Sequence, residues 1–597
     1  MITIASAASH DARLAAGRSP IMGDCRSRSS RPRVNAFTDV GEGPRRVDVR
    51  PSLDGKEIPM TLPDPDHRRA HNLVALAVGA LALGACVDDV DTDTGTQALV
   101  FPAPIDDVPL GGGPCPTVRT DINQSMVVTA ATHPGLTTRF TFARVMQQIV
   151  DTGGSALQNK LSVYQEWMAT YASPACSTID PNGYGLPCPR APEAQLAATD
   201  PFVTPSQAPF TAIGLFNRFD LAPQTGETCG EHRIVFALPS GLTRAFIIFE
   251  AALPNPQPGL GVDGCYPVTR FWQSLSGMTV AARLDALEAF YFTGVVEPIT
   301  GVTIGPVVTA ANYGLAVRSG PIRIDPPIEI TPIDPVAETA RVTGADDPAA
   351  VGARAMTDHV DADGMIMSYG GTARFGQIRT NMFVNFAEWN LREFKLVRDC
   401  TGLTRRCTLR FEHVPVAANP ANELFLDSHA NSAAFQASLI EQVAGLAAAT
   451  DANQIALSTE TNHDELESAP QRADVDFAAA GHASAGLQAS ITARLTTIGS
   501  PLSVGNILDR AKTQTCAGCH RRSAGTNLGG FSWPADAGFV HITEGGGLSA
   551  ALTGTFLPRR RVVLDQFIAA RCGPTPVPPS PVDEERTVSG APVGSTN

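Results

Sequence analysis

The chain lacks three motifs that often identify an enzyme: the Walker A phosphate loop, the HExxH metalloprotease signature and the GxSxG nucleophile elbow. It is also short of positive charge, since 45 lysines and arginines face 59 aspartates and glutamates, for a net charge of −14. Phosphate binding needs clustered Lys and Arg, so this balance argues against a nucleic-acid partner. With 17% charged and 43% hydrophobic residues, the composition is typical of a globular protein rather than a disordered or multi-span membrane chain.

Length and hydrophobic periodicity predict an α+β protein with several domains. The 597 residues are too many for one hydrophobic core. Helical and strand-like patterns are mixed up to about residue 420, and helical periodicity dominates after it. We therefore expect a β-rich, mixed N-terminal region followed by a small all-α module. In chain order the expected parts are an α+β domain (121–325), a second region of strands and then helices (326–470), the all-α module (480–572) and a disordered tail (573–597).

The clearest individual elements lie in the first of these regions. Apolar residues recur at helical spacing over 138–150, 161–171 and 280–292. Runs rich in Ile, Val and Phe predict strands over 210–222, 232–238 and 244–253.

Residues 73–85 form a short apolar run, LVALAVGALALGA, preceded by Arg68 and Arg69. A basic flank followed by a run too short to span a bilayer is typical of a signal peptide, with a chance core helix as the alternative. The run ends in an LGAC sequence that resembles a bacterial lipobox. This resemblance implies that Cys86 is lipidated and becomes the mature N-terminus of an exported, membrane-anchored protein.

A signal peptide normally starts a chain, but here an Arg-rich stretch without hydrophobic periodicity precedes it. We expect translation to begin at Met60, the signal peptide to cover 60–85, and residues 1–59 to be a non-native extension. Residues 86–120 then form an acidic tether. Val87, rather than Asp, follows the lipobox cysteine. By the sorting habit of lipoproteins, this predicts the outer membrane of a Gram-negative bacterium.

Twelve cysteines are many for a cytosolic protein and predict disulfides, which persist in an oxidising compartment. Reduced, buried cysteines are the alternative. Setting aside Cys25, Cys86 and the two cysteines of the motif described below leaves eight, an even number. The expected pairs are Cys176–Cys188, Cys229–Cys265, Cys400–Cys407 and, as the remaining two, Cys115–Cys572.

Two groups of polar residues in the strand-rich part invite a catalytic interpretation. Catalysis would need two carboxylates, or a base beside a nucleophile, to converge in space. Sequence order alone does not show convergence, so we favour buried ion pairs and strand ends. The groups are Asn217, Arg218, Asp220, Glu231 and His232, and Arg379, Asn381, Trp389, Arg392 and Glu393.

The motif with the most specific chemistry is Cys516-Ala517-Gly518-Cys519-His520, a CxxCH. On a helical turn, positions i, i+3 and i+4 share one face. Two thiols can then bond the two vinyl groups of one haem while the imidazole of His520 meets the iron. CxxCH is the attachment pattern for c-type haem. The alternatives are a CxxC disulfide and a zinc site, and zinc is weak because only Cys572 and His541 remain nearby as ligands.

An amphipathic segment over 507–511 leads into this motif, and a Gly-rich stretch over 525–530 follows it. In these features the chain resembles class I c-type cytochromes over roughly 484–572, so the resemblance implies a cytochrome c-like fold for the all-α module. That family usually supplies an axial Met downstream of the motif, and this chain has no Met after His520. His541 is the one downstream imidazole and is expected either as the second iron ligand or as a structural residue.

Other sixth ligands remain open: His463 or His482 upstream, a Met from the body of the chain, or an open position. The haem pocket wall is expected to include Leu528, Phe531, Trp533 and Phe556, although plain core packing explains these residues equally well. A solvated basic face is the favoured interpretation of Arg559, Arg560 and Arg561, and pairing with haem propionates is the alternative.

The sequence therefore predicts an exported lipoprotein with one covalent haem c that transfers electrons to an unknown partner in the periplasm or at the cell surface. Cys516, Cys519 and His520 would hold the haem. As an electron carrier it would not be an enzyme. Two alternatives differ in class. One is a haem oxidoreductase whose N-terminal region binds a substrate. The other is a surface binding or structural lipoprotein in which the CxxC is only a disulfide.

Overall fold

An 11-stranded sheet dominates the structure, which is a computed structural model. The described residues are 118–155, 158–172, 179–204, 206, 209–240, 243–319, 357–360, 366–369, 375–383, 389–400, 407–469 and 482–572. Along the sheet the strands follow the order β1-β2-β3-β4-β10-β11-β7-β9-β8, with β12 and β13 also paired to β11. Every described pairing in it is antiparallel except β11 with β7.

The strands that build this sheet, and the separate two-stranded ribbon of β5 and β6, have the following bounds: β1 Val127–Thr129, β2 Thr211–Arg218, β3 Thr228–Ser240, β4 Thr243–Pro254, β5 Val295–Val296, β6 Thr303–Ile304, β7 Ala316–Ser319, β8 Thr357–Val360, β9 Ile366–Tyr369, β10 Gln377–Phe383, β11 Asn390–Asp399, β12 Thr408–Val414 and β13 Glu467–Ser468.

The α-helices surround the sheet and dominate the C-terminal part of the described chain. Their bounds are α1 Leu136–Arg139, α2 Phe142–Gly153, α3 Lys160–Ala169, α4 Ala191–Ala194, α5 Tyr266–Ser274, α6 Val280–Phe292, α8 Ser432–Ala448, α9 Ala485–Thr497, α10 Val504–Lys512 and α11 Leu557–Ala569. Helices α2, α3 and α6 and strands β2, β3 and β4 confirm the segments expected there from periodicity.

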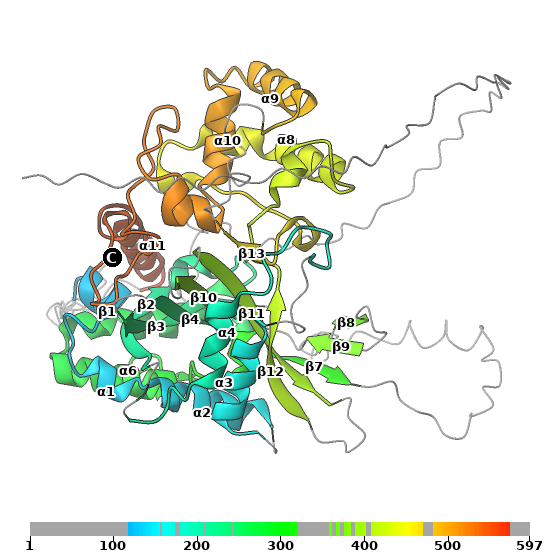
Figure 1. Cartoon of the computed structure of the whole chain (residues 1–597). Helices are drawn as coiled ribbons and strands as arrows, with labels where there is room; N and C mark the ends of the chain where they lie inside the picture. The colour runs from blue at the N-terminus through cyan, green and yellow to red at the C-terminus, as the bar shows by residue number, and fades with distance from the viewer. Residues whose placement is uncertain are drawn as a thin grey trace, which may run out of the picture. The chain divides into compact units, whose positions relative to one another are not determined.

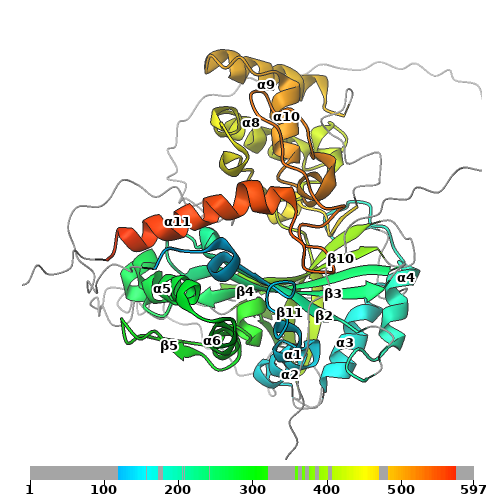
Figure 2. The same cartoon turned by 90° about the vertical axis from the view of Figure 1, so that its left-hand side faces the viewer.

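One face of the sheet is apolar because alternate residues of its strands are large and hydrophobic. Ile234, Phe249, Ile378 and Phe394 stand opposite one another in register across β3, β4, β10 and β11. Phe142 of α2 packs against Phe249. Helices α1, α2, α3 and α6 lie on this side of the sheet in both views (Figures 1 and 2). The main hydrophobic core therefore forms between this face and these helices.

The opposite face carries the residues at the alternate positions and is covered by the C-terminal part of the chain. Figure 2 shows α11 lying across this side of the sheet, opposite α1, α2, α3 and α6. Helix α11 also packs on α5. Helices α8, α9 and α10 pack together around a second hydrophobic cluster that includes Leu439, Ile491 and Ile507. The fold is therefore α+β, a large antiparallel sheet followed by C-terminal helices, as predicted.

Strands from distant parts of the sequence meet in the middle of this sheet. Strand β10 pairs with β4 over seven residues, from Gln377↔Glu250 to Phe383↔Arg244. The ranges 121–325 and 326–470 thus contribute to one continuous sheet. All described residues belong to one compact unit.

Two disulfides tie described loops, Cys229–Cys265 and Cys400–Cys407, and both were predicted. Cys188 and Cys572 are disulfide-bonded too, and their expected partners, Cys176 and Cys115, lie outside the described residues. These bonds indicate an oxidising, extracytoplasmic compartment. Across the described ranges, no helix has both the length and the apolar character needed to cross a bilayer.

Candidate functional site

The CxxCH motif lies on a tight helical turn just after α10. The turn is held by Thr515, whose carbonyl oxygen accepts from the Cys519 amide at 2.9 Å and whose Oγ1 accepts from the Gly518 amide at 3.0 Å. The chain passes so close to α10 here that a Cβ on Gly518 would lie 1.7 Å from the Lys512 carbonyl oxygen. Glycine is therefore required between the two cysteines by packing.

Both motif cysteines are free thiols, so the CxxC disulfide of the structural alternative is not formed in this structure. Burial raises the pKa of the Cys516 thiol to about 12 and that of the Cys519 thiol to about 11. Both thiols are therefore protonated at neutral pH.

The imidazole of His520 is oriented through its Nδ1 atom, which lies 2.9 Å from the carbonyl oxygen of Phe539. Phe539 adopts a positive φ of 64°, a costly conformation for an aromatic residue, and this turn presents its carbonyl to the ring. Asn381 fixes the same carbonyl by donating to it at 3.1 Å, and Trp389 Nε1 donates to the Asn381 side chain at 2.6 Å. A carbonyl on one ring nitrogen is the usual support of a metal-bound histidine.

This arrangement sets the tautomer of His520. Nδ1 carries the proton that the Phe539 carbonyl accepts, and Nε2 keeps its lone pair for a metal. Burial lowers the pKa of His520, so the ring is neutral at physiological pH, as a metal ligand must be.

His541, the predicted alternative ligand, lies beside the motif. Its ring centroid is 4.9 Å from that of His520. Nε2 of His541 is 3.4 Å from the Cys519 Sγ, and Nδ1 is 3.0 Å from the Ser549 hydroxyl oxygen. Burial lowers the pKa of His541 well below its usual value. The structure therefore brings a second neutral imidazole to the motif, where it contacts one of the thiols.

A cavity of about 370 Å³ opens in front of the motif, a volume within the ~300–1,000 Å³ range typical of cofactor pockets. Cys516, Cys519, His520 and His541 all line it. Of the predicted wall residues, Trp533 and Phe556 also line the cavity, whereas Leu528 and Phe531 belong to the cluster around α8, α9 and α10.

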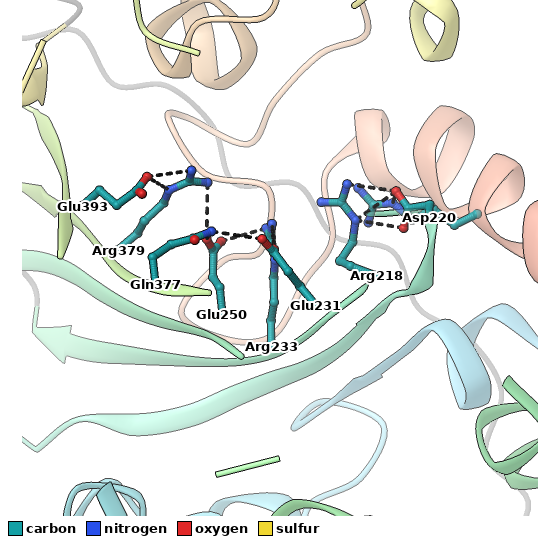
Figure 3. Close-up of polar contacts among 9 residues, drawn as sticks. Arg218, Asp220, Glu231, Arg233, Glu250, Gln377, Arg379 and Glu393 are labelled. Atoms are coloured by element: carbon teal, nitrogen blue, oxygen red, sulfur yellow. Dashed lines mark hydrogen bonds and ion pairs between the residues drawn. The ribbon is translucent and has the colours of Figure 1, made fainter. Parts of the chain in front are cut away.

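The sheet face described above supplies the cavity floor, which carries a network of alternating charges (Figure 3). Arg233 and Arg379 flank Glu250, with Nη1–carboxylate distances of 2.9 and 3.3 Å. Arg233 also pairs with Glu231 at 2.5 Å, and Arg379 with Glu393 at 2.8 Å. Gln377 of β10 links residues of β3 and β4, because its Nε2 donates to Glu231 of β3 at 3.0 Å and to Glu250 of β4 at 2.7 Å.

A second part of the floor lies at the end of β2. Arg218 donates to both carboxylate oxygens of Asp220, at 2.9 to 3.1 Å. The Nε atom of Arg560 on α11 lies 3.5 Å from the same carboxylate. Burial opposes ionisation of Asp220, but the charges of Arg218 and Arg560 outweigh it and lower the pKa of the carboxyl group.

Arg560 thus differs from the solvated basic face that the sequence favoured for the three arginines. Its side chain is only 12% exposed and lines the cavity, as does that of the exposed Arg559. Burial, together with the neighbouring Arg218, lowers the pKa of Arg560 to about 9.

The structure therefore brings the two polar groups of the sequence together at the motif, although not every member. Arg218, Asp220, Arg379 and Asn381 line the cavity, and Glu231 and Glu393 belong to its ion-pair network. His232 instead accepts from Trp272 Nε1 at 3.0 Å in the core, and Arg392 pairs with Glu467 at 2.8 Å. These residues form buried ion pairs, the interpretation that the sequence favoured. The sequence did not predict that several of them also meet at one cavity.

Sequence reasoning also missed Arg233 and Glu250 as members of the floor. A usable signal was the spacing of two between charged residues within a strand, as in Glu231 and Arg233, which places them on one face of the sheet. That signal does not say which strands are neighbours.

A zinc site is not favoured here. Within the residues the structure describes, no group of three or more His, Cys, Asp or Glu side chains is placed to hold a metal ion. Cys572, one of the two ligands considered for zinc, is disulfide-bonded.

Comparison of the chain with known protein families, with curated proteins and with solved structures finds no match.

Proposed function

We propose that the protein is a covalent c-type haem protein that transfers electrons in an extracytoplasmic compartment. The observation that carries the proposal is the meeting of two free thiols and one carbonyl-oriented, neutral imidazole on the wall of a single cavity. A haem bound there would supply one-electron chemistry through the ferrous–ferric couple of its iron.

The residues at the site have distinct tasks in this proposal. Cys516 and Cys519 would hold the haem as thioethers, each S–H adding across one vinyl group to give one S–C and one C–H bond with no net oxidation. His520 would offer Nε2 to the iron, and the Phe539 carbonyl keeps the tautomer that leaves Nε2 free. His541, whose ring centroid is 4.9 Å from that of His520, would be a second imidazole available to the iron.

The cavity walls would give the haem partly apolar surroundings. Phe216, Phe246 and Ile248 of the sheet, with Trp533 and Phe556 of the C-terminal part, contribute apolar surface to it. Such surroundings and the charges of the floor are the features by which a protein sets a haem potential.

The test is a denaturing gel of the mature protein, produced with the c-type maturation apparatus and stained for haem peroxidase activity. Covalent haem stays with the denatured chain, whereas non-covalent haem is lost. The Cys516→Ala/Cys519→Ala variant is the control. A stained wild-type band and an unstained variant band support the proposal, and two unstained bands from folded protein contradict it.

The second candidate function is a haem-dependent oxidoreductase with a substrate bound beside the motif. The charged floor favours it, because an electron carrier does not need four arginines and four carboxylates, Arg218, Arg233, Arg379, Arg560, Asp220, Glu231, Glu250 and Glu393, beneath its haem. Perturbed ionisable groups in a cavity are typical of catalytic sites. Burial raises the pKa of Glu250, and the nearby guanidinium groups only partly offset this effect.

We further propose that the chain is held at a membrane surface through a lipid on Cys86, at the outer membrane of a Gram-negative bacterium. Cys86 and the signal peptide lie outside the described residues, so the support is the lipobox-like sequence together with the disulfides. Detergent phase separation of cells expressing the wild type and Cys86→Ala tests it. The wild type should enter the detergent phase and the variant the aqueous phase, and equal partitioning would contradict the lipid anchor.

A further inference from the structure

The charged floor is fully paired at one end and incompletely paired at the other. An arginine has five N–H donors in a planar fork. Arg233 uses Nε and Nη2 on Glu231 and Nη1 on Glu250, and Arg379 uses Nε and Nη2 on Glu393 and Nη1 on Glu250. All three nitrogens of each guanidinium are therefore engaged.

Arg218 and Arg560 are different. Arg218 directs Nε and Nη2 to Asp220, and its Nη1 has no protein partner in the described part of the chain. The guanidinium of Arg560 lies over the Phe556 ring, with its Cζ 5.9 Å from the ring centroid, and its one ion-pair contact within the described ranges is that of Nε with the same carboxylate at 3.5 Å. Both of its Nη groups therefore have no hydrogen-bond acceptor among the described residues. These donors are also not sealed in the protein, in contrast to the Nη groups of Arg392, which are buried without a partner.

The charge balance at this end points to an anion. The floor as a whole balances four arginines with four carboxylates, but at this end two guanidinium groups share one carboxylate, Asp220, so positive charge gathers here. Both arginines line the cavity at the Cys519 side, where their charges are the largest influences on the thiol after burial. A single negative charge with two oxygens in one plane matches both the positive charge gathered here and the fork geometry of guanidinium donors.

We propose that Arg218 and Arg560 form a carboxylate-binding subsite in the cavity, beside Cys519. The carboxylate comes from one of two sources: a propionate of the tethered haem, which rests on the proposed function, or a small carboxylic acid bound next to the haem. The donors belong to the protein chain itself, so the subsite exists with or without haem.

The test is calorimetric titration of sodium acetate into the full mature chain, prepared both without and with the c-type maturation apparatus, at constant ionic strength. Haem-free protein should bind acetate, and Arg560→Gln should weaken binding by roughly tenfold or more, as expected for loss of a charge-assisted hydrogen bond. Arg561→Gln on the same helix is the matched control. It does not line the cavity and should leave the dissociation constant within about twofold of the wild type.

Haem attachment then separates the two sources. Loss of acetate binding on haem attachment assigns the subsite to a propionate, and retained binding that R560Q still weakens assigns it to a free carboxylic acid. Absence of acetate binding in the haem-free wild type, equal binding in R560Q, or binding of sulfate but not acetate overturns the proposal. If the chain never takes up haem, the proposed function is refuted. The acetate titration of the haem-free protein would still test whether the carboxylate subsite exists.

The folding of R560Q is checked by circular dichroism and gel filtration. If that variant does not fold, Arg560→Lys decides the matter. It keeps the charge but loses the fork, so it should weaken acetate binding by roughly threefold to tenfold. Unchanged acetate binding in R560K would overturn the proposal.

Discussion

Asn381 is expected to support both the stability of the fold and the orientation of His520, and replacing it with Ala tests both roles. The side chain is 2% exposed, accepts from Trp389 Nε1 at 2.6 Å and donates to the Phe539 carbonyl oxygen at 3.1 Å, and its Nδ2 also lies 3.5 Å from His520 Nδ1. N381A removes both bonds, and with them the acceptor that lies 2.6 Å from Trp389 Nε1. Each lost hydrogen bond of a buried neutral group costs about 1 kcal/mol, so we expect a loss of about 2 kcal/mol.

A matched control lies one strand away. Asn390 on β11 is fully buried, and its two amide atoms have no hydrogen-bond partner within the described residues. N390A therefore removes no bond, and relief of the buried orphan amide offsets the small cavity left behind. Its free energy of unfolding should stay within about 1 kcal/mol of the wild type. Urea unfolding at neutral pH, followed by tryptophan fluorescence, measures both variants.

The haem-loaded protein gives a second readout of the same change. A partner that orients a metal-bound histidine typically contributes 10–100-fold to ligand affinity, so added imidazole should displace His520 in N381A at roughly tenfold lower concentration than in the wild type. N390A should behave as the wild type does. Equal losses of stability in N381A and N390A, or an unchanged imidazole titration in N381A, would refute the role assigned to the bonds among Asn381, Trp389 and Phe539.

Two further predictions concern the body of the fold. The loss of chain entropy in the unfolded state predicts that the Cys229–Cys265 disulfide, with a 36-residue separation, stabilises the fold by about 4 kcal/mol, and that Cys400–Cys407, with a 7-residue separation, does so by about 2 kcal/mol. Replacing the first pair with Ala should therefore lower the urea midpoint more than replacing the second pair. The reverse order would contradict this account. Burial lowers the pKa of His232 to about 3, whereas the value in the unfolded chain is near 6.5. Below pH 6.5 the unfolded state therefore binds a proton that the folded state does not, and the free energy of unfolding should fall as the pH drops from 6.5 towards 3. In His232→Gln the side chain can still accept from Trp272 but does not titrate, so this variant should lose less stability in acid, and an equal loss would contradict the role given to His232.

The sequence predicted the local elements well because their signals are local. Helix α6 spans the segment 280–292 that periodicity marked, and the two short-range cysteine pairs with both members described are bonded. The CxxCH motif could be recognised because its chemistry is contained in five consecutive residues. The structure places the ring of His541 4.9 Å from that of His520, and the role of His541 as an iron ligand stays a prediction.

The charged floor could not be predicted because it depends on which strands are neighbours. Glu250 and Gln377 become partners only when β4 pairs with β10, and a sequence pattern shows which face a residue takes but not which strand lies beside it. The positive φ of Phe539, which aims its carbonyl at His520, likewise has no sequence signal, because glycine is the residue that usually marks such a conformation.

The central claim is that Cys516, Cys519 and His520 hold one covalent haem in the cavity, and a pyridine haemochrome spectrum tests it most directly. The mature protein, co-expressed with the c-type maturation apparatus, should give the band of a haem whose two vinyl groups are saturated, with one haem per chain. The Cys516→Ala/Cys519→Ala variant should give no such band. A folded wild-type protein that is colourless, or whose haem is extracted by acidified solvent, would contradict the account.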